Sequence, residues 1–398
     1  MRILMMIHRL ADNSPYCFYV HEQAKALRAQ GHDVTVISCV GTMPMMKALR
    51  PALYETDRRT PKEAVIDGVP VYFPRCLTLG NAGERWLGGW PMYRAALPIA
   101  QRLHAQKPFD LLHAHMLPRE GHAGRLLGRA LGLPVALTVH GTDVFHYFIP
   151  GQTPWKRNVE TARRVDALMA VSSLLLSRVA PYRGEGRISR VVQNGVDLSL
   201  VPENEARRPR TVISVGTLKA RKCMDKTLEA FARLADEYGD ATLTIVGIGE
   251  MEHALRARIA ELHLEGRVTL TGGLPHEEVL RRMAQSDLFV LPSWGEGYGI
   301  VYIEAMAAGC IAVGAENEGI ADTITDGENG FLVPAGDTDA VERVMRAVFA
   351  HPEAYEALRA RGMRDARELT WAHNAEITAG VYREAMEHWR KEHAQAGH

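Results

Sequence analysis

The stretch between residues 288 and 313 constrains the fold more than any other part of the chain. The apolar runs Leu288–Pro292 and Cys310–Val313 each have the length and continuous hydrophobicity of a buried parallel strand. A glycine-rich turn lies between them. It is followed by a segment from about Gly299 that is typical of a helix, which Gly309 can end in a left-handed conformation. This strand–helix–strand order predicts a parallel α/β sheet.

The glycine-rich turn also carries chemistry. Gly295, Gly297 and Gly299 precede the N-terminus of the predicted helix, where unpaired N–H groups and a partial positive charge favour an anion. Glu296 and Glu304 would repel a phosphate placed beside them, but ionised carboxylates accept hydrogen bonds from hydroxyls. A sugar nucleotide has both phosphates and hydroxyls and would satisfy the whole stretch. The alternative is an ordinary strand–turn–helix with a solvated glutamate.

Length and composition set the class of protein. A chain of 398 residues suits two domains of ordinary size, and 46% hydrophobic residues with 24% charged residues are typical of a soluble globular protein. No apolar run approaches the length needed to cross a bilayer, and Ile3–Ile7 is too short for a signal peptide. The five cysteines are scattered and lack C-x-x-C spacing, so we expect reduced thiols in a cytoplasm rather than disulfides or a zinc site.

The net charge of zero hides an asymmetry between the two halves of the chain. Residues 1–197 contain 25 Lys and Arg against 15 Asp and Glu, a balance of +10, and residues 198–398 contain 22 against 32, a balance of −10. One explanation is chance together with complementary docking of the halves. The other is a first half that faces an anionic membrane surface or a lipid-phosphate acceptor. No nucleic-acid-binding motif is present, and the basic residues are dispersed.

Two segments of the first half are predicted to be irregular insertions, residues 42–60 and 80–98. Each mixes basic residues with methionine, leucine, tryptophan or tyrosine, a combination typical of segments that lie in a membrane interface. We therefore predict peripheral association with the inner face of a membrane. The alternative is that each insertion packs its own small core.

The first half shows further strand patterns at Asp33–Ser38, Asp110–His113 and Pro134–Val139. In parallel sheets ligands bind beyond the carboxyl ends of the strands. Loop 8–15 and His140, which begins the sequence His-Gly-Thr-Asp after the third of these strands, are therefore expected at the ligand-binding edge. The spacing of the histidines at 113, 115, 122 and 140 matches no usual ligand pattern, so we expect no metal there and a buried polar role for those at 113 and 115.

The sequence E-G-Y-G-I-V-Y-I-E-A-M-A-A-G, from Glu296 to Gly309, resembles the signature of glycosyltransferase family 4, the retaining glycosyltransferases of the GT-B fold. The resemblance implies two Rossmann-like, doubly wound α/β domains facing a cleft, with a C-terminal helix that crosses back to the first domain. On that pattern we predict an acceptor-binding domain over 1–202, a charged linker over 203–210, a nucleotide-sugar domain over 211–370 and the returning helix over 371–398.

The resemblance also implies roles for single residues. In the family the first glutamate of the signature contacts the donor hexose, the second contacts the nucleotide ribose, and the residues at 271–275 line the base. Lys222 falls on the lysine that binds the donor diphosphate, and His140 on the cleft histidine near the donor sugar. The predicted catalytic residues are His140, Lys222 and Glu296, and the predicted donor-binding residues are Thr217, Arg221, Lys222, Gly247, Gly273, Glu296, Gly297, Tyr298, Gly299, Ile300 and Glu304.

The chain departs from the family pattern at several positions. Thr217 replaces the usual arginine, and either Arg221 or Lys219 is available to supply that charge. Cys223 replaces a glycine, and Glu318-Gly319-Ile320-Ala321-Asp322 takes the place of G-G-x-P-E. Loop 8–15 lacks the Gly-Gly pair that family members often carry there.

The function that the resemblance implies is transfer of a hexosyl unit from a UDP- or GDP-sugar to a hydroxyl, with retention and with no cofactor or metal. Lipid-linked and cell-envelope polysaccharide precursors are the candidate acceptors. Two other functions stay open at this point, a nucleotide-sugar epimerase on the same fold and a non-catalytic sugar-nucleotide sensor. An epimerase would isomerise the sugar without any acceptor. The nucleotide base, the hexose and the acceptor are not identified by the sequence.

Overall fold

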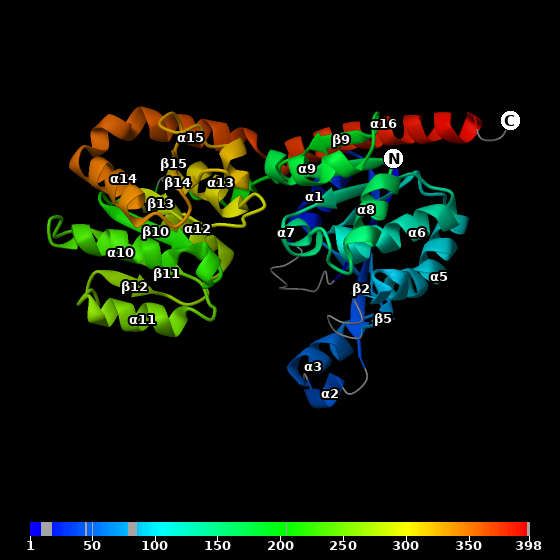
Figure 1. The fold of residues 1–398 in the computed structure, drawn as a ribbon, viewed down its shortest axis with the longest axis horizontal. Helices are drawn as coiled ribbons and strands as arrows, with labels where there is room; N and C mark the ends of the chain where they lie inside the picture. The colour runs from blue at the N-terminus through cyan, green and yellow to red at the C-terminus, as the bar shows by residue number, and fades with distance from the viewer. Residues whose placement is uncertain (9–17, 44–45, 50, 79–85, 204, 396–398) are drawn as a thin grey trace. The chain divides into compact units, whose positions relative to one another are not determined.

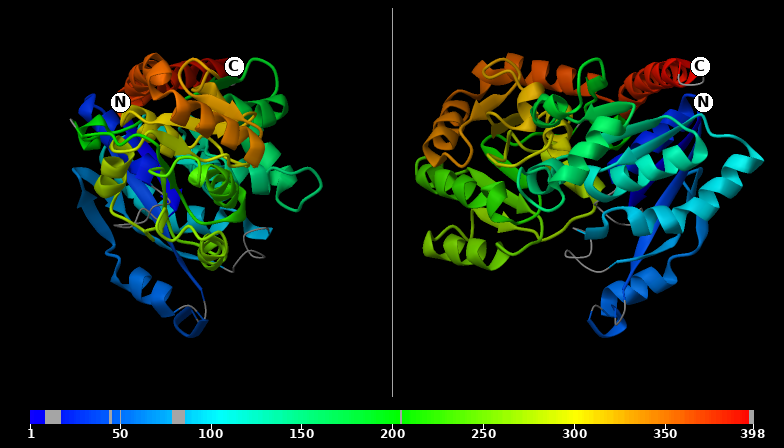
Figure 2. Two further views of the ribbon diagram at one scale, coloured as in Figure 1. Left: turned by 90° about the vertical axis from the view of Figure 1, so that its left-hand side faces the viewer. Right: turned by 45° about the vertical axis from the view of Figure 1, so that its right-hand side comes forward.

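The computed structural model describes residues 1–8, 18–43, 46–49, 51–78, 86–203 and 205–395. By its contacts the chain separates into two units, which we call unit 1 (Met1–Gln193 with Trp371–His398) and unit 2 (Asn194–Thr370). Each unit is a sheet with helices packed on both faces (Figures 1 and 2). Residues 205–210, part of the expected linker, lie in unit 2. The predicted α/β class is confirmed in both units.

The sheet of unit 1 has the order β3-β4-β2-β1-β6-β7-β8-β9, with β5 paired to β2. All its pairs are parallel except β3 with β4. The strands β6, β7 and β8 are buried along their whole length, as their continuous apolar runs predict. The bounds are β1 Arg2–His8, β2 Asp33–Thr42, β3 Glu63–Ile66, β4 Val69–Tyr72, β5 Arg75–Leu77, β6 Leu111–His115, β7 Val135–Val139, β8 Ala167–Ala170 and β9 Ile188–Val191.

The helices of unit 1 cover both faces of this sheet (Figure 1). They are α1 Phe18–Ala29, α2 Met46–Leu49, α3 Pro51–Arg59, α5 Trp90–Gln106, α6 His122–Leu131, α7 Thr142–Tyr147, α8 Trp155–Arg164, α9 Ser173–Val179 and α16 Trp371–Gln395. A single π-helical turn, η1 Leu117–Gly121, precedes α6, and a 3₁₀ turn, η2 Ala180–Tyr182, follows α9.

The C-terminal helix α16 is part of the core of unit 1. Its Tyr382 is fully buried among core residues of the sheet, and its hydroxyl lies 2.6 Å from His113 Nδ1. On α1, Gln23 donates hydrogen bonds to Asn374 Oδ1 at 2.7 Å and to Thr378 Oγ1 at 3.2 Å. Buried polar groups of this kind are costly unless they are paired, so these contacts define where α16 packs.

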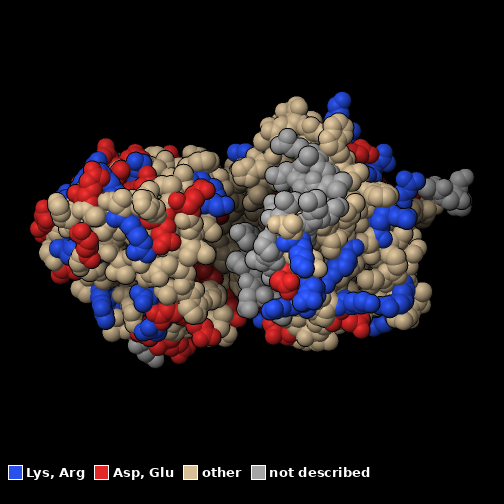
Figure 3. Space-filling model, turned by 90° about the horizontal axis from the view of Figure 1, so that it is seen from below, with Lys and Arg blue, Asp and Glu red and all other residues tan. Residues whose placement is uncertain are grey.

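The insertions are more regular than their composition predicts. The described parts of 42–60 form α2 and α3, and Trp90–Gln106 is one helix, so the expectation of irregular structure is wrong there. Pro91 lies in the first turn of α5, where no intrahelical N–H bond is needed. Lys and Arg side chains outnumber acidic ones on the face of unit 1 that Figure 3 shows. None of the helices in the described parts of the chain combines the length and hydrophobicity that crossing a bilayer requires.

The sheet of unit 2 is parallel throughout, with the order β12-β11-β10-β13-β14-β15. The predicted unit of strand, helix and strand is confirmed as β13–α13–β14, and Gly309 ends the helix with a φ of +93°. The strands are β10 Thr211–Val215, β11 Thr242–Val246, β12 Val268–Leu270, β13 Leu288–Val290, β14 Ile311–Ala315 and β15 Phe331–Val333. The helices are α10 Met224–Ala235, α11 Glu252–Glu261, α12 His276–Ala284, α13 Ile300–Ala307, α14 Thr338–Ala350 and α15 Glu356–Glu368, with 3₁₀ turns η3 Leu198–Leu200, η4 Ala220–Lys222, η5 Gly319–Asp322 and η6 Pro352–Tyr355.

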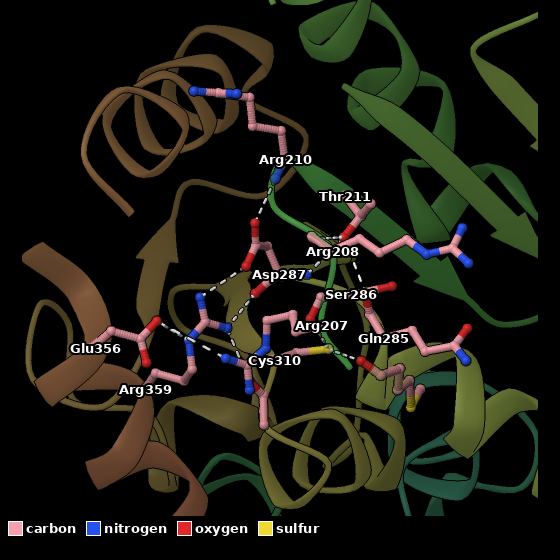
Figure 4. A network of polar contacts seen from close by, with 12 residues as sticks. Arg207, Arg208, Arg210, Thr211, Gln285, Ser286, Asp287, Cys310, Glu356 and Arg359 are labelled. Atoms are coloured by element: carbon pink, nitrogen blue, oxygen red, sulfur yellow. Dashed lines mark hydrogen bonds and ion pairs between the residues drawn. The ribbon is translucent and has the colours of Figure 1, made fainter. Parts of the chain in front are cut away.

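A buried ion pair joins α15 to the amino-terminal edge of this sheet (Figure 4). Arg359 Nη2 lies 3.1 Å from Asp287 Oδ1, just before β13, and Arg359 Nη1 donates to the carbonyls of Asp287 and Gly309 at 3.0 and 2.9 Å. The other carboxylate oxygen of Asp287 accepts the backbone N–H of Arg210 at 2.5 Å. Every polar group of the pair is therefore satisfied at the edge opposite to the glycine-rich turn.

Candidate functional site

The glycine-rich turn of unit 2, residues 293–299, connects β13 to α13 at the carboxyl edge of the sheet. Gly299 is the N-cap of α13 with a φ of +87°, a conformation that favours glycine. Because the N-cap residue is a glycine, it offers no side chain to bond the first N–H groups of this helix. A Cβ on Gly319 would lie only 2.1 Å from the carbonyl oxygen of Gly297, so only glycine lets η5 approach the turn this closely.

The predicted catalytic residues of unit 2 meet directly in the structure. Lys222, on η4 and only 7% exposed, forms an ion pair through Nζ with Oε2 of Glu296. Arg221 Nη1 lies 3.7 Å from the same oxygen and donates to the carbonyl of Gly295 at 3.3 Å. We call Arg221, Lys222 and Glu296 the charged cluster. It carries two positive charges against one negative charge beside the uncapped start of α13.

Lys222 lies just before the start of α10, where a cation is unfavourable unless an anion lies beside it, and Glu296 is such an anion. The 3₁₀ turn that carries Lys222 ends at Cys223, which takes the place of the usual family glycine. The φ of Cys223 is +51°, in the left-handed region where glycine is the residue of least strain. Trp294 also ties the turn to η4, because its N–H donates to the carbonyl of Arg221 at 2.9 Å.

Glu318 is a site residue that the sequence reasoning missed. Its carboxylate accepts two backbone hydrogen bonds, from the N–H of Gly295 at 2.9 Å and from that of Glu296 at 2.7 Å. The next residue, Gly319, donates its own N–H to the carbonyl of Glu296 at 3.1 Å. Residues 318–319 thus hold the backbone of the turn. The only signal in the sequence is that a glutamate stands where family members carry the first glycine of G-G-x-P-E.

Glu304 makes a contact of its own. It lies buried on α13, and its Oε1 is 2.8 Å from Nε2 of His276 at the start of α12. His276 was not among the predicted residues. Tyr298 is almost completely buried, its hydroxyl lies 3.2 Å from Thr323 Oγ1, and burial raises its pKa. Its side chain is therefore part of the packing, and only its backbone is available to a ligand.

The remaining predicted donor-binding residues follow successive strands of unit 2. Thr217 is exposed after β10, Gly247 follows β11, and Gly273 is exposed in the loop after β12. A Cβ on Gly247 would lie 1.8 Å from the carbonyl oxygen of Gly216, so these two loops touch through their backbones. Because all these loops leave the carboxyl ends of parallel strands, they share the edge at which such sheets bind ligands.

In unit 1 the predicted His140 follows β7. Asp143 holds the loop, since its Oδ1 accepts the N–H of His140 at 3.0 Å and that of Gly141 at 2.8 Å, and its Oδ2 accepts the N–H of Leu117 at 3.1 Å. The centre of the His140 ring lies 4.3 Å from that of Tyr19, with the two rings tilted by 33°. A buried aspartate so fully paired fixes the position of the histidine that follows the strand.

Three histidines of unit 1 form a chain of close contacts. His140 Nε2 lies 3.1 Å from His115 Nδ1, whose ring centroid is 4.0 Å from that of His113. His113 Nε2 in turn lies 2.8 Å from Thr138 Oγ1. Burial lowers the pKa of His113 and of His140 to about 3, and that of His115 well below its usual value, so all three are neutral near pH 7. The buried polar role expected for His113 and His115 is confirmed.

A cavity of about 150 Å³ lies beside the His140 loop. It is lined by residues of β1, η1, α7 and α8, including His8, Arg119, Glu120, Tyr147 and Arg157. His8 Nδ1 pairs with the buried Glu120, whose pKa is held down by His8 and Arg119 against the effect of burial. The rest of loop 8–15 lies outside the described residues. Among those described, no group of three or more His, Cys, Asp or Glu side chains is arranged to hold a metal ion.

Comparison with known proteins agrees with this architecture. A family model described as Glycosyltransferase Family 4 matches residues 18–200, and one described as Glycosyl transferases group 1 matches residues 199–365. Glycogen synthase of Mycobacterium tuberculosis is 28% identical over 92% of this chain and 89% of its own length. The GDP-mannose-dependent alpha-(1-6)-phosphatidylinositol monomannoside mannosyltransferase of Mycolicibacterium smegmatis is 28% identical over 60% of this chain and 67% of its own length.

Among solved structures, Anabaena Alr3699/HepE in complex with UDP and glucose matches with a TM-score of 0.73 at 18% identity, over 96% of this chain and 100% of the other. The fold is thus that of the GT-B glycosyltransferases. The two family models together match residues 18–365, and the chain belongs to glycosyltransferase family 4. The protein is a hexosyltransferase.

Proposed function

We propose that the enzyme transfers a hexosyl unit from a nucleotide diphosphate sugar, a UDP- or GDP-sugar, to a hydroxyl with retention of configuration. The observation that carries this proposal is the charged cluster of Arg221, Lys222 and Glu296 beside the uncapped N-terminus of α13. The two cations and the helix start suit a diphosphate, and Glu296 suits sugar hydroxyls. Glu304, buried on the same helix, is assigned to the ribose.

The proposed chemistry uses no covalent nucleophile, and both glutamates are assigned to binding hydroxyls. The bond between the anomeric carbon and the diphosphate oxygen breaks while the acceptor oxygen bonds on the same face, and the acceptor proton passes to the departing diphosphate. Negative charge grows on that diphosphate, and Lys222 with the first N–H groups of α13 stabilises it. No cofactor or metal enters the proposal.

His140 suits a role at the donor sugar. Since its pKa is lowered to about 3, its ring is neutral and can hydrogen-bond a sugar hydroxyl without adding positive charge where the sugar itself becomes electron-poor. For the acceptor we propose the cavity beside His140 in unit 1. A lipid-linked hydroxyl is one candidate, by analogy with the phosphatidylinositol mannoside named for the M. smegmatis relative.

The test is a comparison of Glu296→Gln with Glu304→Gln. Loss of the ribose contact at Glu304 should mainly raise the donor KM, because the ribose does not change during the reaction. Loss of the hexose contact at Glu296 should also lower kcat, because charge develops on the sugar. Steady-state kinetics at saturating acceptor, with nucleotide affinity measured alongside, separates the two. The reverse pattern would exchange the roles, and unchanged kinetics in both would refute the proposal.

A matched assay separates transfer from the alternative functions. Release of nucleotide diphosphate should depend on the acceptor, whereas an epimerase isomerises the sugar with no acceptor and a sensor does neither. Lys222→Ala should lower kcat about a hundredfold, by analogy with the removal of one oxyanion donor. An unchanged kcat would remove Lys222 from the mechanism and transfer its role to Arg221.

A further inference from the structure

One layer of helices in unit 1 is strongly basic. The helices α5, α6 and α8 pack against one another, α5 on α6 and α6 on α8, and α5 and α6 contain no acidic residue. Glu160 on α8 is the one acidic residue of the three helices, all of which lie within the described residues. Their basic residues are all exposed or half-exposed: Arg94, Arg102, Arg125, Arg129, Lys156, Arg157, Arg163 and Arg164.

Large apolar side chains stand in solvent at one end of this layer. Trp86 is 78% exposed, Trp90 at the start of α5 is 50% exposed, and Leu87 between them is 37% exposed. The guanidinium of Arg94 lies 5.8 Å from the centre of the Trp90 ring. Burial of even one of these indoles would be favourable, so leaving both in water calls for an explanation.

The backbone holds these side chains in place on the layer. Arg157 of α8 donates to the carbonyl of Trp86 at 3.0 Å, and the N–H of Gly89 donates to Nδ1 of His122 at the start of α6 at 3.1 Å. A Cβ on Gly89 would lie 1.9 Å from the carbonyl oxygen of Arg119, so the segment lies directly on η1. The exposed indoles are therefore fixed beside the amino-terminal ends of α6 and α8.

We propose that this basic aromatic face, formed by α5, α6 and α8 with residues 86–90, docks on an anionic lipid bilayer. Basic residues close to such a surface are attracted electrostatically, and tryptophan is favoured at the level of the headgroups. The combination favours a bilayer over a nucleic-acid duplex, whose phosphates would use the charges but whose stacked bases would leave the indoles in water. This docking does not depend on the proposed donor or reaction.

The arrangement of charge supports the assignment. Arg125 is partly buried, and burial lowers its pKa; Glu160 raises it, and the neighbouring Arg164 and Arg129 lower it. One carboxylate thus faces several guanidinium groups, and an external anion relieves their repulsion. Arg157 belongs both to this face and to the cavity beside His140. A bilayer bound here would hold a lipid-borne hydroxyl near that cavity.

The first test is cosedimentation of the full-length protein with phosphatidylcholine vesicles that contain or lack phosphatidylglycerol. Binding should require the anionic lipid and weaken with salt. The double variant Arg129→Gln/Arg163→Gln should bind about 25-fold more weakly, at about fivefold for each basic residue near the surface. The control Arg343→Gln/Arg364→Gln removes two exposed charges from α14 and α15 of unit 2 and should bind like the wild type.

The second test addresses the indoles. Trp86→Ser/Trp90→Ser keeps every charge and should still lose affinity for anionic vesicles, while its thermal unfolding stays that of the wild type because both side chains are exposed. Equal binding to neutral and anionic vesicles would overturn the proposal, as would an unaffected Arg129→Gln/Arg163→Gln variant. Unchanged vesicle binding by the tryptophan variant would also overturn the proposal. The charges alone would then bind, and the face would be a site for a soluble polyanion.

Discussion

The ion pair between Lys222 and Glu296 makes a quantitative prediction. Removing one partner of a buried pair costs 3–5 kcal/mol because it leaves an uncompensated charge. Here the side chains keep 9% and 15% of their exposure, so the cost is smaller. We expect Glu296→Gln to lower the free energy of unfolding by about 2 kcal/mol, since Lys222 is left beside Arg221. Lys222→Met should cost about 1 kcal/mol, because Arg221 at 3.7 Å still faces the carboxylate.

The double variant Lys222→Met/Glu296→Gln removes both charges at once. Its cost should be smaller than the sum of the single costs by about 1–2 kcal/mol, the coupling expected for residues in direct contact. Urea unfolding of the full-length protein, followed by far-ultraviolet circular dichroism, gives these values.

A matched control is available on α10. Lys226 Nζ lies 3.0 Å from Glu229 Oε2, but both side chains are about a third exposed, so the pair should show little coupling. The refuting result is additivity of Lys222→Met and Glu296→Gln. It would mean that the charges of Lys222 and Glu296 do not interact, and the charged cluster would lose its place in the proposed donor site.

Three further outcomes follow from buried groups in the two units. Arg359→Leu should lower the free energy of unfolding by about 3 kcal/mol in the same urea assay, because it leaves Asp287 buried without its partner. Cys223→Gly should change it by less than about 1 kcal/mol, since relief of the left-handed backbone offsets the lost side chain, and steady-state kinetics should be unaltered. For His113 and His140 the folded pKa of about 3 lies below the unfolded value of 6.5. Their contribution to stability is therefore complete above pH 6.5 and falls as the pH drops toward 3. His113→Asn should flatten the fall in the free energy of unfolding between pH 7 and pH 5, as measured by urea unfolding followed by far-ultraviolet circular dichroism.

The strands were predictable because buried parallel strands appear as continuous apolar runs. That signal placed β7, β13 and β14 close to their observed bounds. The helix α5 was missed although its buried residues Met92, Ala96 and Ala100 recur at helical spacing. Its two prolines and the preceding glycines outweighed that periodicity. The hairpin of β3 and β4 was missed as well, because its strands alternate over only four residues each.

Candidate site residues could be named from the sequence, but the contacts between them could not. The family resemblance assigned roles to Lys222 and Glu296, yet they lie 74 residues apart in the chain, and no local pattern shows that they form an ion pair. The pairing arises because η4 follows β10 and the turn follows β13, and these strands are neighbours in the sheet. The pairing of Glu304 with His276 has the same origin, since it depends on how α12 packs on α13.

Glu318 shows what a family pattern leaves out. Family members carry a glycine at this position, and a glycine has no side chain to which a role could be assigned. The motif therefore gives no reason to expect a functional carboxylate there. In this chain that carboxylate accepts the N–H groups of Gly295 and Glu296, while Lys222 holds the side chain of Glu296. Glu296 is thus fixed through both its backbone and its side chain, as its proposed role at the donor sugar requires. Groups fixed in this way need no reordering during the reaction, which is the condition under which a charged side chain contributes most to catalysis.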